Sequence, residues 1–230
     1  MMLPRGLIVS CQAYEGDPLF GPPIMAAMAR AAQQGDAVAI RANGPDDIAA
    51  IHAAVSLPIV GLWKIGPTGR HDVYITPDAE SAAAIAAAGA DMLAIDATPR
   101  PRRSGIDLPT LIAFIHDQLH KPVMADISCL EDALRAVDAG ADVVSTTLAG
   151  YTAHGRPRTD EPDLALLTDV IQHLPGIPVI AEGRFTTPEQ AAAAFDQGAH
   201  AVVVGAAITR PEQITARFTR AIDARIHSGP

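Results

Sequence analysis

The chain has 230 residues, enough for one large domain or two small ones. It carries 17 Lys and Arg against 26 Asp and Glu, and the formal net charge of −9 disfavours binding to nucleic acid or to anionic membrane surfaces. Hydrophobic residues make up 49% and aromatic residues only 4%, which is typical of a sheet covered by alanine-rich helices and argues against an aromatic-lined groove. An anionic ligand therefore needs a local binding site.

Cysteine content and the apolar segments bear on the compartment. Cys11 and Cys129 are too few for a disulfide framework in a chain of this length, and the low count is typical of a reducing environment. Residues 1–6 contain no apolar stretch of the signal-peptide type, and the longer apolar stretches carry charges or glycines. We therefore expect neither a signal peptide nor a membrane span, and a cytoplasmic protein.

Short apolar runs of strand length alternate with longer stretches of helical period along the chain. The expected strands are residues 6–12, 37–43, 58–64, 91–98, 122–128, 142–148, 178–184 and 201–208. The expected helices that follow them are residues 22–34, 45–55, 77–88, 107–119, 129–139, 163–173, 187–197 and 211–226. The alternation therefore predicts eight βα units.

Glycine and proline mark the boundaries of these units. A weak repeat, A-A-G-A-D, D-A-G-A-D and D-Q-G-A-H, ends a helix with glycine just before a strand. Pro58, Pro122 and Pro178 stand at the first residue of a strand, where a missing N–H is tolerated. Strict alternation allows a doubly wound sheet or a closed barrel, and eight units favour an α/β fold of the (βα)8 TIM barrel type. No linker divides the chain, so we expect residues 1–230 to form a single domain.

Polar side chains stand at the carboxyl ends of the expected strands, where (βα)8 barrels carry their active sites. In chain order they are Gln12, Arg41, Asn43, Lys64, Asp96, Asp126, Thr146, Thr147, Glu182 and Arg184, with Gly205 ending the last strand. Any single one could be a salt-bridged plug of the barrel. Buried charge is costly, however, so this many convergent polar groups predicts a functional site.

Four of these residues end alternate strands, namely Gln12, Lys64, Asp126 and Glu182. Barrel interiors are filled in layers drawn from alternate strands, so the four form one layer if their heights match. A lysine and two carboxylates around one small volume suit the movement of protons on and off a substrate carbon.

Two glycine-containing segments, residues 181–184 and 203–210, close the last two strands. Barrels commonly bind phosphate at this place with backbone N–H groups and a helix N-terminus. Gly183 and Gly205 would let the backbone approach the anion, and Arg210 would supply charge. The alternative is that the glycines only form tight turns.

The sequence contains no pattern for a metal or a nucleotide cofactor. No histidine stands at an expected strand end, and neither G-x-G-x-x-G nor G-x-x-x-x-G-K-[ST] occurs. We therefore expect an activity that requires no cofactor and no metal.

Several segments spread along nearly the whole chain carry a resemblance to one enzyme family. They are G-L-I-V-S-C-Q-A at 6–13, A-I-R-A-N-G at 39–44, I-D-A-T at 95–98, R-P-R at 100–102, M-A-D-I-S at 124–128, T-T-L-A-G-Y-T at 146–152, V-I-A-E-G-R at 179–184 and V-V-V-G-A-A-I-T-R-P at 202–211. In these segments the chain resembles the N-acetylmannosamine-6-phosphate 2-epimerases, isomerases that form N-acetylglucosamine 6-phosphate in sialic acid breakdown.

The resemblance implies a role for each matched residue. It implies a phosphate-binding TIM barrel in which Lys64 and Glu182 are catalytic. The sugar contacts that it implies are Gln12, Arg41 and Asp126, and the phosphate contacts are Gly183, Arg184, Gly205 and Arg210. One departure stands out: the family's lysine is usually followed by Arg-Asp, whereas here Ile65 and G-P-T-G-R-H-D follow Lys64.

The chemistry of such a reaction fits these residue types. Inverting C2 without a nicotinamide requires removal of the C2 proton and the return of a proton to the other face. That proton is acidic only when C1 is an aldehyde, so the sugar ring must open first. A neutral lysine can take the proton, and Arg41 or a protonated acid can stabilise the enediolate. Whether Lys64 and Glu182 serve opposite faces, or one base serves both, stays open.

Two other functions would use part of the same residue set. A phosphosugar aldolase would use Lys64 as a Schiff base and share the phosphate loops. A non-catalytic sugar-phosphate sensor would keep Arg210 and the glycines but need neither Lys64 nor Glu182. As partners we expect a small-molecule phosphosugar, no nucleic acid and no membrane, and we allow for a homodimer.

Overall fold

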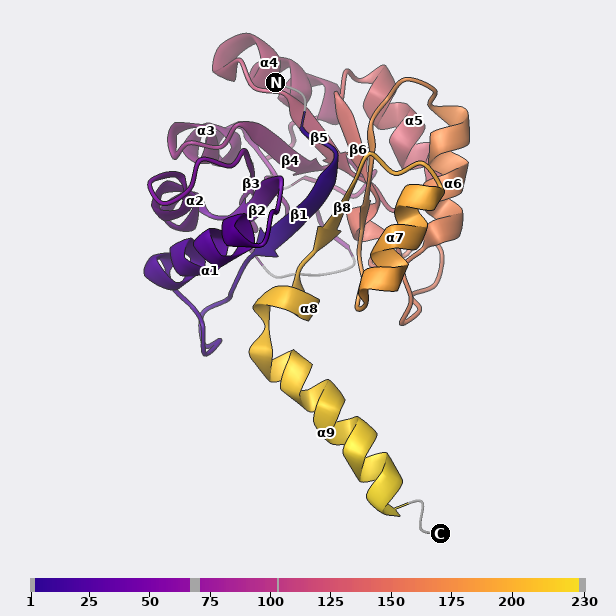
Figure 1. Cartoon of the computed structure of the whole chain (residues 1–230). Helices are drawn as coiled ribbons and strands as arrows, with labels where there is room; N and C mark the ends of the chain where they lie inside the picture. The colour runs from indigo at the N-terminus through magenta and orange to yellow at the C-terminus, as the bar shows by residue number, and fades with distance from the viewer. Residues whose placement is uncertain (1–2, 67–70, 103, 228–230) are drawn as a thin grey trace.

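The computed structural model describes residues 3–66, 71–102 and 104–227, and it contains a closed barrel of eight parallel strands (Figure 1). The strands pair in chain order, and β1 pairs with β8 to close the barrel. Their bounds are β1 Gly6–Cys11, β2 Ala39–Asn43, β3 Ile59–Leu62, β4 Met92–Asp96, β5 Val123–Asp126, β6 Val143–Ser145, β7 Val179–Glu182 and β8 Ala201–Val204. The expected TIM barrel is confirmed.

Helices follow the strands, as the periodicity predicts. Their bounds are α1 Pro22–Gln34, α2 Pro45–His52, α3 Ala79–Ala87, α4 Leu108–Leu119, α5 Leu130–Asp138, α6 Leu164–His173, α7 Pro188–Asp196, α8 Ala206–Thr209 and α9 Pro211–His227, with a 3-10 turn η1 at Thr146–Leu148. Local signals explain several starts: the side chains of Asp78 and Thr187 cap α3 and α7, and a proline stands in the first turn of α1 and α2. The sequence therefore determines these boundaries to within a few residues.

The expected strands over residues 142–148 and 201–208 are both wrong in their second halves. β6 ends at Ser145, and the 3-10 turn η1 follows it directly. β8 ends at Val204, and the amides of Ile208 and Thr209 donate to the carbonyl of Gly205, which begins α8. The run A-V-V-V-G-A-A-I at 201–208 contains no polar side chain, and apolarity alone does not separate a strand from a short helix. The turn at Gly205 therefore places a helix start directly at the barrel mouth.

The core has two layers. Inside the barrel, alternate strand residues such as Ile8, Val60, Met124 and Ile180 pack against one another. The intervening strand residues face outward and pack against the helices, as a parallel sheet covered by helices requires. Continuing this alternation to the strand ends turns the polar residues of the mouth inward.

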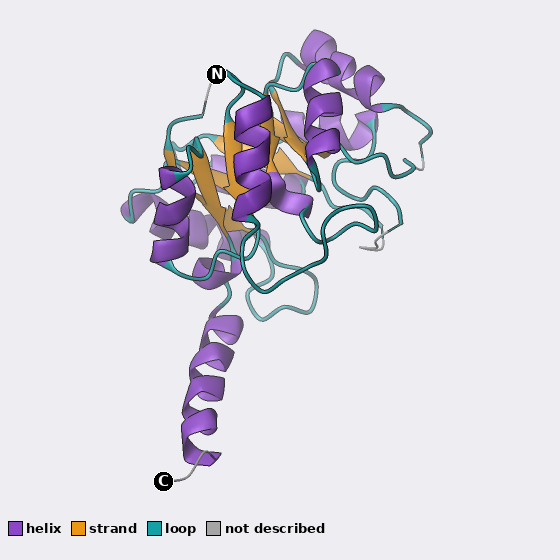
Figure 2. Ribbon diagram, turned by 90° about the vertical axis from the view of Figure 1, so that its right-hand side faces the viewer, coloured by secondary structure: helices purple, strands orange, loops and turns teal. Residues whose placement is uncertain are grey.

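Helix α9 departs from the expected arrangement. Residues 211–227 form a helix as predicted, but it projects away from the barrel instead of covering it (Figures 1 and 2). None of its residues is buried, and Phe218, Ile222 and Ile226 are 69%, 58% and 68% exposed. Across the described ranges, no helix is both long and apolar enough to cross a membrane.

Candidate active site

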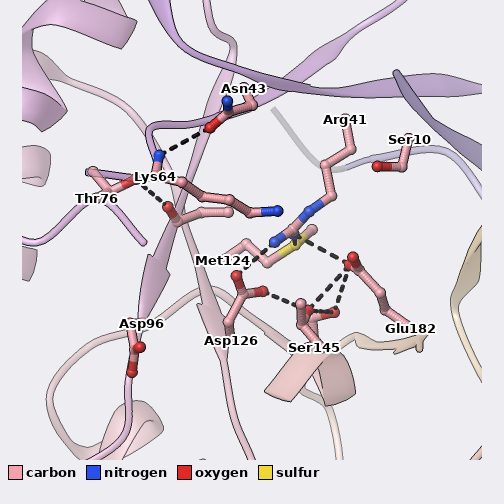
Figure 3. A network of polar contacts seen from close by, with 12 residues as sticks. Ser10, Arg41, Asn43, Lys64, Thr76, Asp96, Met124, Asp126, Ser145 and Glu182 are labelled. Atoms are coloured by element: carbon pink, nitrogen blue, oxygen red, sulfur yellow. Dashed lines mark hydrogen bonds and ion pairs between the residues drawn. The ribbon is translucent and has the colours of Figure 1, made fainter. Parts of the chain in front are cut away.

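Arg41 is the centre of the polar network at the barrel mouth (Figure 3). Its side chain, on β2, is 1% exposed. Its Nη2 lies 2.5 Å from Oδ2 of Asp126 on β5, and its Nη1 lies 3.3 Å from Oε2 of Glu182 on β7. Nη1 also donates to the sulfur of Met124 at 3.2 Å. One buried cation is thus shared by two carboxylates from strands on other parts of the barrel.

Hydroxyl groups from β6 and η1 complete this network. Thr147 Oγ1 donates to Asp126 Oδ1 at 2.7 Å and lies 3.1 Å from Glu182 Oε2. Ser145 Oγ lies 3.4 Å from the same Glu182 oxygen. Both carboxylates are therefore held in fixed positions before any substrate arrives.

Burial and charge act against each other on these groups. Burial raises the pKa of Glu182, and Asp126 raises it further, although Arg41 lowers it; the net direction is upward. For Arg41 burial disfavours the charge, but the two carboxylates outweigh burial and raise the pKa. Arg41 therefore stays a cation, while Glu182 keeps a proton to higher pH than an ordinary glutamate does.

Lys64 and Gln12 stand on two other sides of the mouth. The Lys64 backbone amide donates to Asn43 Oδ1 at 2.9 Å, and its Nζ donates to the hydroxyl of Tyr14 at 2.8 Å. Gln12 Nε2 donates to Ser10 Oγ at 2.8 Å. Within the described residues, Gln12 Oε1 and Arg41 Nε are buried polar atoms without a hydrogen-bond partner. Such atoms are uncommon in native proteins, and a site that awaits a polar ligand explains them.

Two adjoining cavities open at this end of the barrel. The smaller, of about 260 Å³, is lined by residues that include Gln12, Arg41, Lys64 and Glu182. The larger, of about 720 Å³, extends over the predicted phosphate loops and includes Arg184 and Gly205 among its lining residues. Tyr151, Glu182 and Gly183 line both cavities. A ligand with a polar head and an anionic tail can therefore span from one to the other.

The four residues expected in one layer do not all meet the cavity. Gln12, Lys64 and Glu182 line the smaller cavity. Asp126 is fully buried and is linked to it through the ion pair with Arg41. Arg41 comes from an even-numbered strand, so the mouth combines residues of both layers.

The predicted phosphate residues adopt different roles in the structure. Gly183, with φ 111°, and Gly205 line the larger cavity with their backbone. Arg184 also lines it, but its guanidinium donates to the carbonyls of Ala149 and Glu161 and so holds the loop that follows β6. Arg210 is outside the lining; its Nη2 lies 3.0 Å from Asp17 Oδ2.

Asp96 ends β4 but belongs to a separate network. It is fully buried, pairs with Arg100 and accepts hydrogen bonds from the amide and hydroxyl of Thr98. This residue is a salt-bridged plug of the kind that the sequence left as an alternative.

Residues 67–70, part of the unusual segment after Lys64, lie outside the described residues.

His154, in the loop that follows β6, belongs to a second polar cluster with Ser128 and Asp132. His154 Nε2 lies 3.0 Å from Ser128 Oγ and 3.2 Å from Asp132 Oδ2, and Asp132 also pairs with Arg135. Cys129, Asp132 and His154 could jointly reach a metal ion, but the carboxylate oxygens of Asp132 already accept from Ser128 and Arg135. The cluster ties the loop to α5.

Among the side chains of the two cavities that sequence reasoning missed are Tyr14, Tyr74, Tyr151 and Arg158. All four lie in loops, where no strand end marks a position as inward-facing. The scarcity of tyrosine in the sequence was a usable signal, because all three tyrosines of the chain line the smaller cavity. The guanidinium of Arg158 stacks on Tyr151, 4.9 Å from the ring centre.

The chain matches known proteins along most of its length. Residues 25–224 match the family model NanE, described as "Putative N-acetylmannosamine-6-phosphate epimerase". Proteins named "Putative N-acetylmannosamine-6-phosphate 2-epimerase" are 49% identical over 218 residues in Cutibacterium acnes (94% of this chain, 93% of that one) and 48% identical over 227 residues in Caldanaerobacter subterraneus (98% and 94%). A solved structure of the N-acetylmannosamine-6-phosphate 2-epimerase from Clostridium perfringens has a TM-score of 0.89 and 44% identity, covering 94% of this chain and 92% of that one.

Proposed function

The chain belongs to the NanE family, and we propose that it is a 2-epimerase that converts N-acetylmannosamine 6-phosphate to N-acetylglucosamine 6-phosphate. The observation that supports this best is the pair of adjoining cavities. Lys64, Glu182 and Arg41 surround the smaller one, and it opens into a larger one lined by the glycine loops. Proton carriers and a place for an anion thus lie within the reach of one sugar phosphate.

The proposed reaction is metal-independent proton transfer at C2 of the ring-opened sugar. Lys64 and Glu182 line the same cavity and are the two groups that can carry the proton to and from C2. Glu182, whose pKa is raised, can also hold the proton as an acid. Arg41, a cation fixed by Asp126 and Glu182, stabilises the negative charge that develops on the enediolate oxygen, and it needs no rearrangement to do so.

The phosphate is proposed to bind over the last two βα loops. Gly183, Gly205 and Ala206, the first residue of α8, line the larger cavity. The glycines have no side chain and Ala206 has only a methyl group, so the backbone is accessible to an anion. Binding energy from the phosphate then holds C2 against Lys64 and Glu182. Arg184 contributes by holding the wall of this cavity in place.

Incubation of the purified protein with N-acetylmannosamine 6-phosphate in D2O tests this function. We expect the product N-acetylglucosamine 6-phosphate to carry deuterium at C2, because a proton removed by a side chain exchanges with solvent. Proton NMR measures this deuterium incorporation. Product that keeps its original hydrogen quantitatively would contradict free exchange with solvent, a requirement for NAD would contradict the mechanism, and absence of product would contradict the function. A covalent adduct trapped with borohydride would instead favour a Schiff-base aldolase.

Arg210→Ala is expected to weaken use of the phosphorylated sugar about ten- to a hundredfold in kcat/KM, the effect of losing one charge-assisted hydrogen bond. Arg210 follows α8 directly, and a bound phosphate can replace Asp17 as the ion-pair partner of its guanidinium. Inorganic phosphate should inhibit the variant less. If activity falls equally on unphosphorylated N-acetylmannosamine, Arg210 holds the barrel together and does not bind the ligand.

A homodimer in which two chains exchange α9 would complete the barrel. Ile214, Phe218, Ile222 and Ile226 recur every four residues and form an apolar stripe on a helix that projects from its own barrel, with only its first half lining the larger cavity. In a (βα)8 barrel a helix packs against each strand. We therefore infer that α9 of a second copy of the chain packs at the place of the eighth helix. Residues 1–230 would then form one domain that shares its last helix.

Phe218→Asp combined with Ile222→Asp should convert the dimer to a monomer in sedimentation experiments, because the charges prevent burial of the stripe. Thr219→Asp, on another side of the same helix, is the matched control and should leave the dimer intact. A wild-type protein that sediments as a monomer would refute the exchange.

We also propose that the enzyme is cytoplasmic. Its two cysteines, Cys11 and Cys129, are free thiols, which is consistent with a reducing compartment.

A further inference from the structure

The loop between β1 and α1 carries a short turn at the rim of the smaller cavity. Its ends are tied together: the Tyr14 amide donates to Asp17 Oδ2 at 2.8 Å, and the Asp17 amide donates to the Tyr14 carbonyl at 2.9 Å. The amide of Phe20 donates in turn to the carbonyl of Asp17. Tyr14 is 41% exposed and lines the cavity. This turn therefore presents an aromatic side chain at the mouth in a defined position.

The Tyr14 hydroxyl holds the amine of Lys64. The two polar atoms are 2.8 Å apart, and Nζ lies 5.3 Å from the centre of the Tyr14 ring. A lysine side chain has four flexible carbons, and an unheld ammonium at a barrel mouth samples many positions. A hydroxyl can accept from an ammonium and donate to a neutral amine, so Tyr14 can stay bonded to Lys64 in both protonation states.

The same turn also contacts Arg210. The guanidinium carbon lies 5.4 Å from the centre of the Tyr14 ring, within the range of cation–π attraction. Asp17 pairs with the same guanidinium at 3.0 Å. Tyr14 thus contacts two cations, Lys64 just after β3 and Arg210 just after α8, and these are the proposed base and the proposed phosphate ligand.

We propose that Tyr14 is a positioning residue that sets the distance between the base at C2 and the cation at the phosphate. Its hydroxyl places Lys64, and its ring places Arg210. This inference rests on the proposed function, since it assigns Lys64 and Arg210 the roles given above. A phosphate that draws Arg210 from Asp17 would do so along the face of the Tyr14 ring, which leaves the Lys64 contact in place.

Two substitutions at Tyr14 separate the two contacts. Tyr14→Phe removes the hydroxyl and keeps the ring, so kcat should fall about three- to tenfold, as for loss of one hydrogen bond, with KM unchanged. Tyr14→Leu removes both, so KM for the phosphorylated sugar should also rise about two- to fivefold, the scale of an exposed cation–π contact. Phe20→Leu, at an exposed aromatic of the same loop, is the matched control and should change neither parameter.

Binding of inorganic phosphate, measured by calorimetry, gives a readout that does not depend on turnover. Tyr14→Phe should bind phosphate as the wild type does, and Tyr14→Leu should bind it two- to fivefold more weakly. Unfolding temperatures of all three variants should match the wild type, since a structural role alone would lower them.

A normal kcat in Tyr14→Phe, or equal phosphate binding in the two Tyr14 variants, would overturn the proposal. If the wild type has no epimerase activity, the proposed function fails by itself, while the phosphate titrations still decide whether the ring positions Arg210.

Discussion

Lys64→Ala and Glu182→Ala are each expected to lower kcat by at least ~10²-fold, the usual scale for loss of a general acid or base. Both residues line the cavity in which C2 would lie, and no other lysine among the described residues lines it. The measurement is the rate of epimerisation by NMR at saturating substrate. Circular dichroism and the unfolding temperature show whether each variant keeps the fold.

Two further variants sharpen this test. Glu182→Gln keeps the shape of the side chain and its hydrogen bonds with Thr147 and Ser145 but cannot carry a proton, so it should be as slow as Glu182→Ala. Glu189→Gln, at an exposed acid on α7, should retain wild-type activity. Near-normal turnover in both Lys64→Ala and Glu182→Gln would refute the catalytic assignment.

Asp126→Ala is expected to destabilise the fold by about 3–5 kcal/mol, the cost of breaking a buried ion pair by removing one partner. Asp126 and Arg41 are both almost completely buried, and the alanine would leave the Arg41 charge with only Glu182, at 3.3 Å. The loss should therefore fall toward the lower end of that range. Urea unfolding measures it, and an unchanged slope against denaturant would assign the effect to stability.

The double variant Arg41→Met with Asp126→Leu is the control for this prediction. Replacing a buried ion pair by apolar side chains is often neutral or stabilising, so the double variant should be more stable than Asp126→Ala. It should nevertheless be inactive, because the cation at the barrel mouth is gone. A double variant as unstable as the single one would show that the cost arises from packing and not from an unpaired charge.

The sequence by itself determined the barrel and the candidates for its site. Apolar runs of strand length, helix-capping residues such as Asp78 and Thr187, and prolines at strand starts act within a few residues, so their pattern is readable without a structure. Strand alternation also turned Lys64 and Glu182 toward the mouth. Their positions in the chain therefore placed them among the candidates, and the family resemblance assigned them the catalytic role.

Only the tertiary structure decided which of these residues pair and that α9 projects from the barrel. Arg41 meets Asp126 across 85 residues, and Tyr14 meets Lys64 across 50. These partners are chosen by barrel closure and by loop conformation, which no local pattern encodes. The same holds for Asp96. In sequence it resembles the other acids at strand ends, but in the structure its carboxylate forms a buried ion pair with Arg100. For α9 the helical period predicted the helix, but its projection from the barrel is set by packing beyond the helix itself.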